Sequence, residues 1–136
     1  GINELSLPIT EAEVKKGVAD YLQYGKNQGK WLYLRLNAGS FIFENPDGSH
    51  RRIQGVEKGT ADFVVFQPVS YSLTYSGTPL NHHPPAIPAT RVTFLEIKSS
   101  KGKQSPEQII FEVEVGKQNC RYFLVRNADE LEGILS

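Results

Sequence analysis

Apolar and polar residues follow one another along this chain in a pattern that predicts a helix, a run of strands, a second helix and a last strand. The first helix is expected from Glu11 to Tyr24, with Gly25 as its stop. The second is expected over 105–116, where Ser-Pro-Glu-Gln supplies a cap and a proline in the first turn. A short helix or turn is expected over 129–135. Strands are expected, in chain order, over 31–36, 41–43, 50–53, 60–66, 91–98 and 121–126.

The segment 67–89 separates the two strongest strands, 60–66 and 91–98. It holds five of the eight prolines and almost no charge. A loop of this length is uncommon inside a compact domain. We therefore expect a partly extended hairpin or an ordered flap, centred on 81–85.

The order of these elements predicts the α/β class, bordering on α+β, with a central mixed sheet and helices on its faces. The length of 136 residues fits one domain, 1–136, with 67–89 as an insert. The helix over 105–116 is expected to join 91–98 to 121–126 as a right-handed parallel crossover. Strands 60–66 and 91–98 are expected to pair as antiparallel neighbours.

The amino-acid composition limits the classes of binding partner that we expect. Fifteen basic and fifteen acidic residues give no net charge, which argues against a tight electrostatic binder of nucleic acid. The basic residues are clustered, however, so one face can still be basic. No apolar run approaches the length that crosses a membrane, so we expect no membrane partner. The single cysteine excludes an internal disulfide and a cysteine-based zinc cluster, and a reducing, intracellular setting is the simplest interpretation.

Two carboxylates stand at the ends of the strongest strands. Asp62 opens one strand and Glu96 comes near the end of the other. In an antiparallel pair the two would meet at one edge of the sheet, where they repel unless a cation or proton lies between them. Oxygen ligands suit Mg²⁺ or Mn²⁺, and Lys98 on the same face as Glu96 could orient an attacking water. The alternative is that Asp62 only forms a turn and that Glu96 and Lys98 form a solvated salt bridge at the end of their strand.

Two further polar residues are candidates for this site. Glu11 falls in the middle of the apolar stripe of the first helix, where an acid needs a partner, although the helix dipole alone favours an acid there. Gln108 opens the second helix, where a capping box with Ser105 is a sufficient explanation.

The motifs, taken in order, resemble the VRR-NUC group of the PD-(D/E)XK nucleases, which are similar to Holliday-junction resolvases. The resemblance runs from about residue 10 to 130. Ala61 occupies the position of the proline in the PD-(D/E)XK motif, and Asn127 occupies the position of the second arginine in the VRR motif. The matching stretches are the first helix with its glutamate, Gly59-Thr60-Ala61-Asp62, Glu96-Ile97-Lys98, Ser105-Pro106-Glu107-Gln108 and 126–129.

The resemblance implies a restriction-endonuclease-like core and a Mg²⁺- or Mn²⁺-dependent DNA endonuclease. Asp62, Glu96 and the backbone carbonyl of Ile97 would hold the metal, with Glu11 as a further candidate ligand. Lys98 would be the catalytic lysine, and Gln108 a supporting polar residue. The substrate would be DNA, sometimes branched or flapped, in repair or recombination in the cytoplasm of a bacterial or phage-infected cell. The candidate DNA contacts are Lys101, Lys103, Arg51, Arg52 and Lys58.

Two other hypotheses stay open. One is a non-catalytic nucleic-acid-binding or assembly module that retains the nuclease fold. The other is an unrelated small α+β protein, which would place Asp62 and Glu96 too far apart to share a cation. Resolvase-like relatives act as dimers, so a homodimer is open as well.

Overall fold

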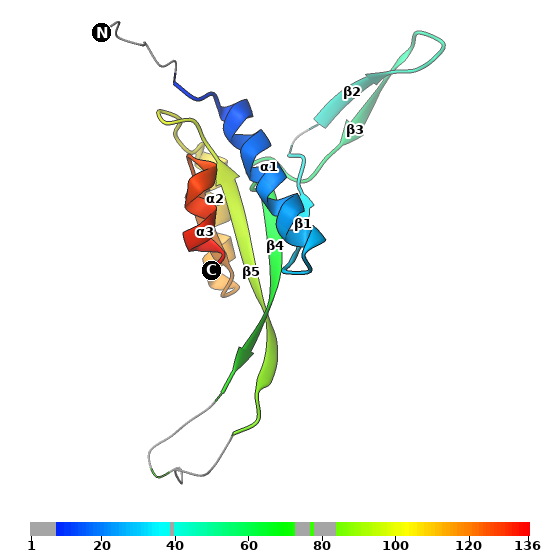
Figure 1. Ribbon diagram of the computed structural model, residues 1–136. Coiled ribbons are helices and arrows are strands. Elements are labelled where there is room, and N and C mark those ends of the chain that lie inside the picture. Colours follow the sequence, from blue (N-terminus) through cyan, green and yellow to red (C-terminus); the bar gives the residue numbers. More distant parts are fainter. Residues whose placement is uncertain (1–7, 39, 73–76, 78–83) are drawn as a thin grey trace, which may run out of the picture.

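The computed structural model describes residues 8–38, 40–72, 77 and 84–136. Figure 1 shows a central body with two long projections. The chain begins with one long helix, continues through five strands, and returns through a helix and a strand to two short helices at its end. The elements are α1 (Glu11–Asn27), β1 (Leu32–Arg35), β2 (Ser40–Glu44), β3 (His50–Gln54), β4 (Phe63–Tyr71), β5 (Ile87–Ile97), α2 (Pro106–Lys117), β6 (Arg121–Val125), η1 (Ala128–Glu130) and α3 (Leu131–Ile134).

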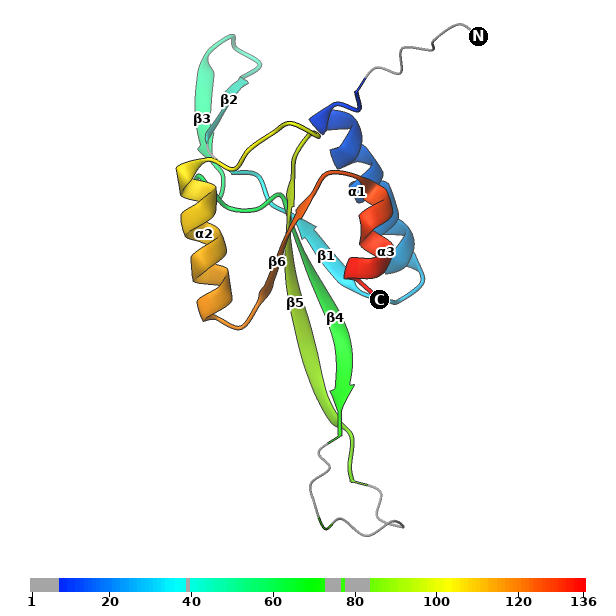
Figure 2. The ribbon, with the colours of Figure 1, turned by 90° about the vertical axis from the view of Figure 1, so that its left-hand side faces the viewer.

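The body contains a four-stranded sheet in the order β1-β4-β5-β6. β1 and β5 both pair with β4 in antiparallel fashion, while β5 and β6 run parallel, joined through α2. Helices α1 and α3 lie on one face of this sheet and α2 on the other (Figure 2). The predicted mixed sheet flanked by helices is therefore confirmed, and so are the antiparallel pair and the parallel crossover.

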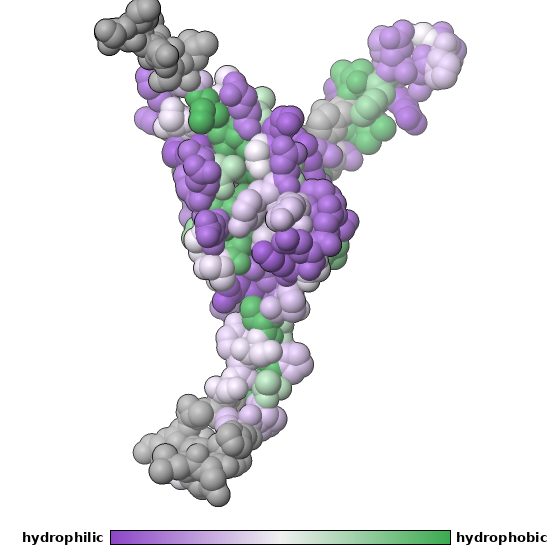
Figure 3. All heavy atoms as spheres, in the orientation of Figure 1, coloured by the Kyte–Doolittle hydropathy of each residue, from purple (hydrophilic) through white to green (hydrophobic). Residues whose placement is uncertain are grey.

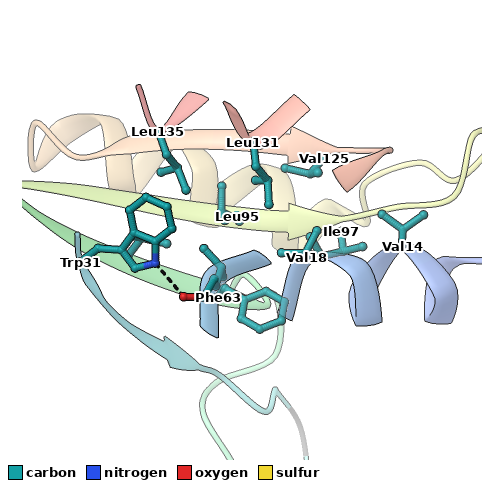
Figure 4. Close-up of a cluster of buried hydrophobic side chains, with 11 residues drawn as sticks. Val14, Val18, Trp31, Phe63, Leu95, Ile97, Val125, Leu131 and Leu135 are labelled. Carbon is teal, nitrogen blue, oxygen red and sulfur yellow. Dashed lines mark hydrogen bonds between the residues drawn. The ribbon is translucent and has the colours of Figure 1, made fainter. Parts of the chain in front are cut away.

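The core lies between the sheet and the two helices α1 and α3 (Figure 4). Helix α1 presents Val14, Val18 and Leu22 at helical spacing, and they pack against Phe63, Leu95 and other buried side chains. Full burial of each such side chain is worth about 1.5–3 kcal/mol. This packing fixes α1 across the sheet, so that the start of α1 lies at the edge where β5 ends.

Gly25 does not stop α1, contrary to the prediction, because the helix continues to Asn27. The reason for a glycine here is packing. A Cβ on Gly25 would lie 1.9 Å from the Trp31 ring, which crosses the helix at this point. The indole also donates a 2.8 Å hydrogen bond from Nε1 to the carbonyl of Leu22 (Figure 4). The chain reverses at Gly29, whose φ of +74° is the left-handed conformation that glycine favours.

The insert proves to be an extension of two core strands. β4 and β5 stay paired beyond the body as far as Tyr71 and Ile87, and they form the lower projection in Figure 1. The hairpin part of the prediction is confirmed for these flanks. Most of the expected centre, 81–83, lies outside the described residues.

The second projection is the β2–β3 hairpin, a separate two-stranded sheet that leaves the body at the opposite end (Figure 1). Hydrophobic residues follow its shaft and hydrophilic residues its tip (Figure 3). Ile42 pairs with Arg52 and Phe43 with Arg51, so the two arginines lie on opposite faces of the hairpin. All four side chains are exposed.

None of the helices in the described part of the chain combines the length and the apolar character that a membrane crossing requires.

Candidate active site

Asp62 is held immediately before β4, between two other strands. Its amide donates a 3.0 Å hydrogen bond to the carbonyl of Leu95 on β5, and its carbonyl accepts a 2.8 Å bond from the amide of Leu36, just after β1. The strand predicted from residue 60 begins only at Phe63. The backbone of Asp62 is therefore fixed at this edge of the sheet, and its side chain lies outside the hydrophobic core.

Gly59 explains how the chain reaches this position. It has a φ of +96°, and a Cβ there would lie 2.7 Å from the backbone of Glu107 at the start of α2. Only glycine satisfies both the left-handed conformation and this close approach. The loop before Asp62 is thus packed against the first turn of α2.

Glu96 lies beside Asp62 on the neighbouring strand. The register ends with Phe63 opposite Leu95, so Asp62 comes directly before this last pair and Glu96 directly after it, and the two carboxyl groups are hydrogen-bonded to each other. The amide of the following residue, Ile97, donates a 2.7 Å hydrogen bond to Oδ2 of Asp62. The two carboxyl groups therefore do lie together at one edge of the sheet.

Glu96 is a buried acid, with only 2% of its surface exposed. This burial is the main reason that its pKa rises to about 9, and a hydrogen bond to Asp62 and the negative charge of Asp62 raise the pKa further. The charge of Glu11 acts in the same direction, while Lys98 lowers the pKa. At neutral pH the side chain is protonated, and its Oε1 has no hydrogen-bond partner among the described residues.

Lys98 follows the last residue of β5. Its amide donates a 3.0 Å hydrogen bond to the carbonyl of Val125 on β6, which continues the parallel pairing past the strand end. Its ammonium is close enough to affect the pKa of Glu96. It makes no ion pair with any acid that the structure describes. This cation thus stands next to the carboxyl pair and is available to another anion.

Glu11 is near the site but is not buried, so that part of the prediction is wrong. Its side chain is 47% exposed, because Glu11 is the first residue of α1 and extends beyond the sheet. It forms a long ion pair of 4.0 Å with Lys15, one turn later. Its role as a metal ligand stays a prediction.

The sequence analysis did not indicate Lys15, and it gave Arg126 only as part of the matching stretch 126–129, with no role at the site. Nζ of Lys15 lies 3.2 Å from Oδ1 of Asp62. The guanidinium of Arg126 donates hydrogen bonds of 2.6 and 2.8 Å to the carbonyls of Ser99 and Gly102, which fixes the loop after β5. A signal existed for each. Lys15 is one turn from Glu11, and Arg126 ends the strand predicted to run parallel to β5, so both come to the same edge.

Tyr122 on β6 is a third polar neighbour that the sequence did not indicate. Its hydroxyl accepts a 3.1 Å hydrogen bond from the side-chain amide of Gln104. Burial raises the pKa of this phenol, and the charges of Glu96 and Asp62 contribute in the same direction. The site is therefore bounded on the α2 side by a half-buried, neutral phenol.

Gln108 has the capping role that its spacing indicated. Its Oε1 accepts a 2.8 Å hydrogen bond from the amide of Ser105, and the Ser105 hydroxyl accepts one of 3.2 Å from the amide of Gln108. The capping box at the start of α2 is complete. A supporting role at the metal or water stays a prediction.

The candidate DNA contacts are distributed around this edge. Lys101 and Lys103 are exposed on the loop between β5 and α2, and Arg51 and Arg52 are exposed on the β2–β3 hairpin. Lys58 is exposed too but forms a 3.6 Å ion pair with Glu107. An exposed pair of this kind is weak, so Lys58 can exchange its partner at little cost.

The donor set at the edge fits a hard divalent cation. Asp62 supplies a carboxylate, and Glu96 supplies a buried oxygen, Oε1, that no described residue satisfies. In the described residues no group of three or more His, Cys, Asp or Glu side chains is placed to hold a metal ion. Two carboxylates with open water positions are the usual protein contribution to a Mg²⁺ site, whereas dedicated cages of protein ligands are typical of other metals.

The chain matches no protein-family model, no curated protein and no solved structure.

Proposed function

We propose that this chain is a Mg²⁺- or Mn²⁺-dependent deoxyribonuclease with a restriction-endonuclease-like core, similar to the VRR-NUC group. Its action on branched or flapped DNA in repair or recombination is part of the proposal. One observation carries it: a buried glutamic acid, Glu96, is hydrogen-bonded to Asp62 beside the neighbouring strand, and its Oε1 has no partner among the residues that the structure describes.

This pair of acids is costly in a protein that uses it only for structure. Burying a carboxyl without full hydrogen bonding is unfavourable, and a second carboxylate beside it adds repulsion. The pKa of Glu96 is raised to about 9, so its side chain is neutral at pH 7 and the repulsion from Asp62 is avoided. Such a perturbed group next to a free lysine is typical of a functional site.

Each residue of the site has a separate role in the proposed reaction. The amide of Ile97 orients the carboxylate of Asp62, and its carbonyl is the third proposed metal ligand. Glu96 would hold the metal as a carboxylate, after releasing its proton to solvent. Lys98, whose ammonium is paired to no acid in the described part of the chain, stabilises negative charge that develops on the scissile phosphate or orients the water. When bound, Mg²⁺ or Mn²⁺ supplies an activated water and neutralises phosphate charge.

The test is cleavage of a labelled panel of plasmid, single-stranded, flapped and four-way DNA with Mg²⁺, Mn²⁺ or EDTA. We expect the wild type to cut at least one substrate in either metal, leaving a 5′-phosphate, and to cut none in EDTA. Lys98→Ala should cut about 10²–10³-fold more slowly, the usual loss when a group that stabilises transition-state charge is removed. Lys117→Ala is the matched control, because Lys117 is an exposed lysine in the last turn of α2.

The outcomes separate the alternatives. Equal cleavage by Lys98→Ala and the wild type would overturn the role of Lys98. DNA binding without cleavage, unchanged by the substitution, would favour the non-catalytic nucleic-acid-binding module. A protein that neither binds nor cleaves any DNA of the panel would overturn the proposal.

A further inference from the structure

Lys15 connects helix α1 to the candidate metal-binding carboxylate. Its Nζ lies 3.2 Å from Oδ1 of Asp62 and 4.0 Å from Oε2 of Glu11. The side chains of Lys15 and Asp62 are only 26% and 20% exposed. The neighbouring pair on the same helix, Lys16 and Asp20, is 81% and 70% exposed at a similar distance of 3.3 Å. The contact with Asp62 is therefore a shielded ion pair, unlike an ordinary surface pair.

The ammonium faces the one oxygen of Asp62 that the backbone does not use. Oδ2 accepts the hydrogen bond from Ile97, so Oδ1 is the oxygen toward Lys15. A divalent cation bound through Oδ1 would meet the ammonium at the same atom, where two positive charges repel strongly. The two cations therefore compete for one carboxylate oxygen.

We infer that Lys15 is a built-in counter-ion of the metal site: it neutralises Asp62 while no divalent cation is bound and leaves Oδ1 when one binds. This inference rests on the proposed function, because it requires a divalent cation at Asp62. The exchange needs only a side-chain rotation, since a lysine carries its charge on a flexible four-carbon stem. Helix α1 stays in place through its packing on the sheet.

The inference predicts that Lys15 weakens metal binding while it supports the metal-free protein. The first test is calorimetric titration with Mn²⁺ of the wild type, Lys15→Met, Lys15→Arg and Lys16→Met. Methionine keeps an unbranched apolar stem without the charge. We expect Lys15→Met to bind Mn²⁺ about three- to tenfold more tightly, as the loss of one shielded competing ion pair implies. Lys15→Arg retains the charge and should stay near the wild type.

Lys16→Met is the matched control. It removes one positive charge from the same helix but leaves Asp62 and its partner untouched, so its affinity for Mn²⁺ should equal that of the wild type. Equal gains in Lys15→Met and Lys16→Met would show a general effect of charge and would overturn the inference.

Thermal unfolding with and without Mn²⁺ gives a readout that a merely structural lysine would not produce. Lys15→Met should lower the metal-free Tm and enlarge the rise in Tm that Mn²⁺ causes, because tighter binding adds more stability. A structural role alone would lower Tm equally in both conditions and leave the affinity unchanged, which would overturn the inference. If the wild type and every variant failed to bind Mn²⁺, the proposed metal site itself would fall, and the inference with it.

Discussion

The amide of Ile97 donates a 2.7 Å hydrogen bond to Oδ2 of Asp62, across the pair of strands that forms the centre of the sheet. The side chain of Ile97 points the other way and is 1% exposed in the core. One residue thus joins the packing of the fold to the orientation of the carboxylate. The geometry of the site follows from the register of β4 and β5, because a shift by one residue would turn Glu96 into the core and Ile97 out of it.

The bond between Asp62 and Ile97 can be tested by two substitutions at one position. Asp62→Asn keeps an oxygen that accepts from the amide but loses the charge that pairs with Lys15, so we expect it to destabilise the metal-free protein by no more than about 1 kcal/mol. Asp62→Ala leaves the amide without its partner and should cost about 1–3 kcal/mol. Urea unfolding in EDTA measures both, and Mn²⁺ affinity should be lost in both. Equal stability of the two variants would show that the bond contributes little.

The raised pKa of Glu96 makes the stability of the metal-free protein depend on pH. The folded-state pKa of about 9 lies above the ordinary value of 4.5, so the folded state binds the extra proton between these values. The contribution of Glu96 to stability is therefore fully present below about pH 4.5 and is lost as the pH rises toward 9, with a limiting slope of about 1.4 kcal/mol per pH unit. Tm measured in EDTA from pH 5 to 9 should decline accordingly.

Glu96→Gln is the control for this pH dependence. Glutamine has nearly the same shape and cannot ionise, so the decline in Tm toward pH 9 should flatten and the variant should be more stable than the wild type at pH 8. An unchanged pH profile would assign the decline to another group and would count against the neutral state of Glu96.

Two glycines in helices allow a matched test of packing. Gly25→Ala places a methyl group 1.9 Å from the Trp31 ring and should destabilise the protein by about 3 kcal/mol or more, since the core cannot move aside easily. A Cβ on Gly116 in α2 meets nothing within 4 Å, so Gly116→Ala should stabilise by about 0.4–1 kcal/mol. Urea unfolding of both variants is the measurement. A mild effect at Gly25 would mean that the indole can shift.

The loop after β5 provides another test. Arg126→Met removes both hydrogen bonds to the carbonyls of Ser99 and Gly102. We expect faster amide hydrogen exchange over 98–104, because this segment loses its anchor while the core is unchanged. Arg121→Met is the control, since its guanidinium binds the carbonyl of Ile134 at the opposite end of the sheet. Unchanged exchange over 98–104 in Arg126→Met would show that the loop holds its own shape.

The sequence was sufficient where local patterns decide the structure. Periodicity and capping residues located the helices, and the antiparallel pairing of two apolar strands brought Asp62 and Glu96 together. It was insufficient where the outcome depends on how far a helix extends past the sheet. Glu11 is exposed for that reason, and Lys15 reaches Asp62 for the same reason. The packing role of Gly25 could not be seen in the local pattern, because the tryptophan that contacts it lies beyond the helix, just before β1.

In the proposed nuclease, the β2–β3 hairpin would be a contact for a DNA duplex. It leaves the sheet beside Asp62, because the amide just after β1 is bonded to the Asp62 carbonyl. A two-stranded ribbon fits the major groove, and Arg51 and Arg52, which lie on its two faces, would then meet phosphates on both sides. If each arginine contacts one phosphate, Arg51→Ala/Arg52→Ala should reduce the slope of log K against log salt by about 1.8 for duplex DNA.

Fluorescence anisotropy in EDTA at several salt concentrations measures this slope without cleavage. Lys26→Ala/Lys30→Ala is the matched control, because it removes two exposed positive charges around the far end of α1, away from the site edge. Its slope should stay within error of the wild type, since phosphates at the catalytic edge do not reach it. A double arginine variant with the slope of the wild type would exclude the hairpin from the duplex. The exposed Ile42 and Phe43 would then point to a protein partner for this ribbon, because a lone hairpin with apolar faces is only marginally stable in water.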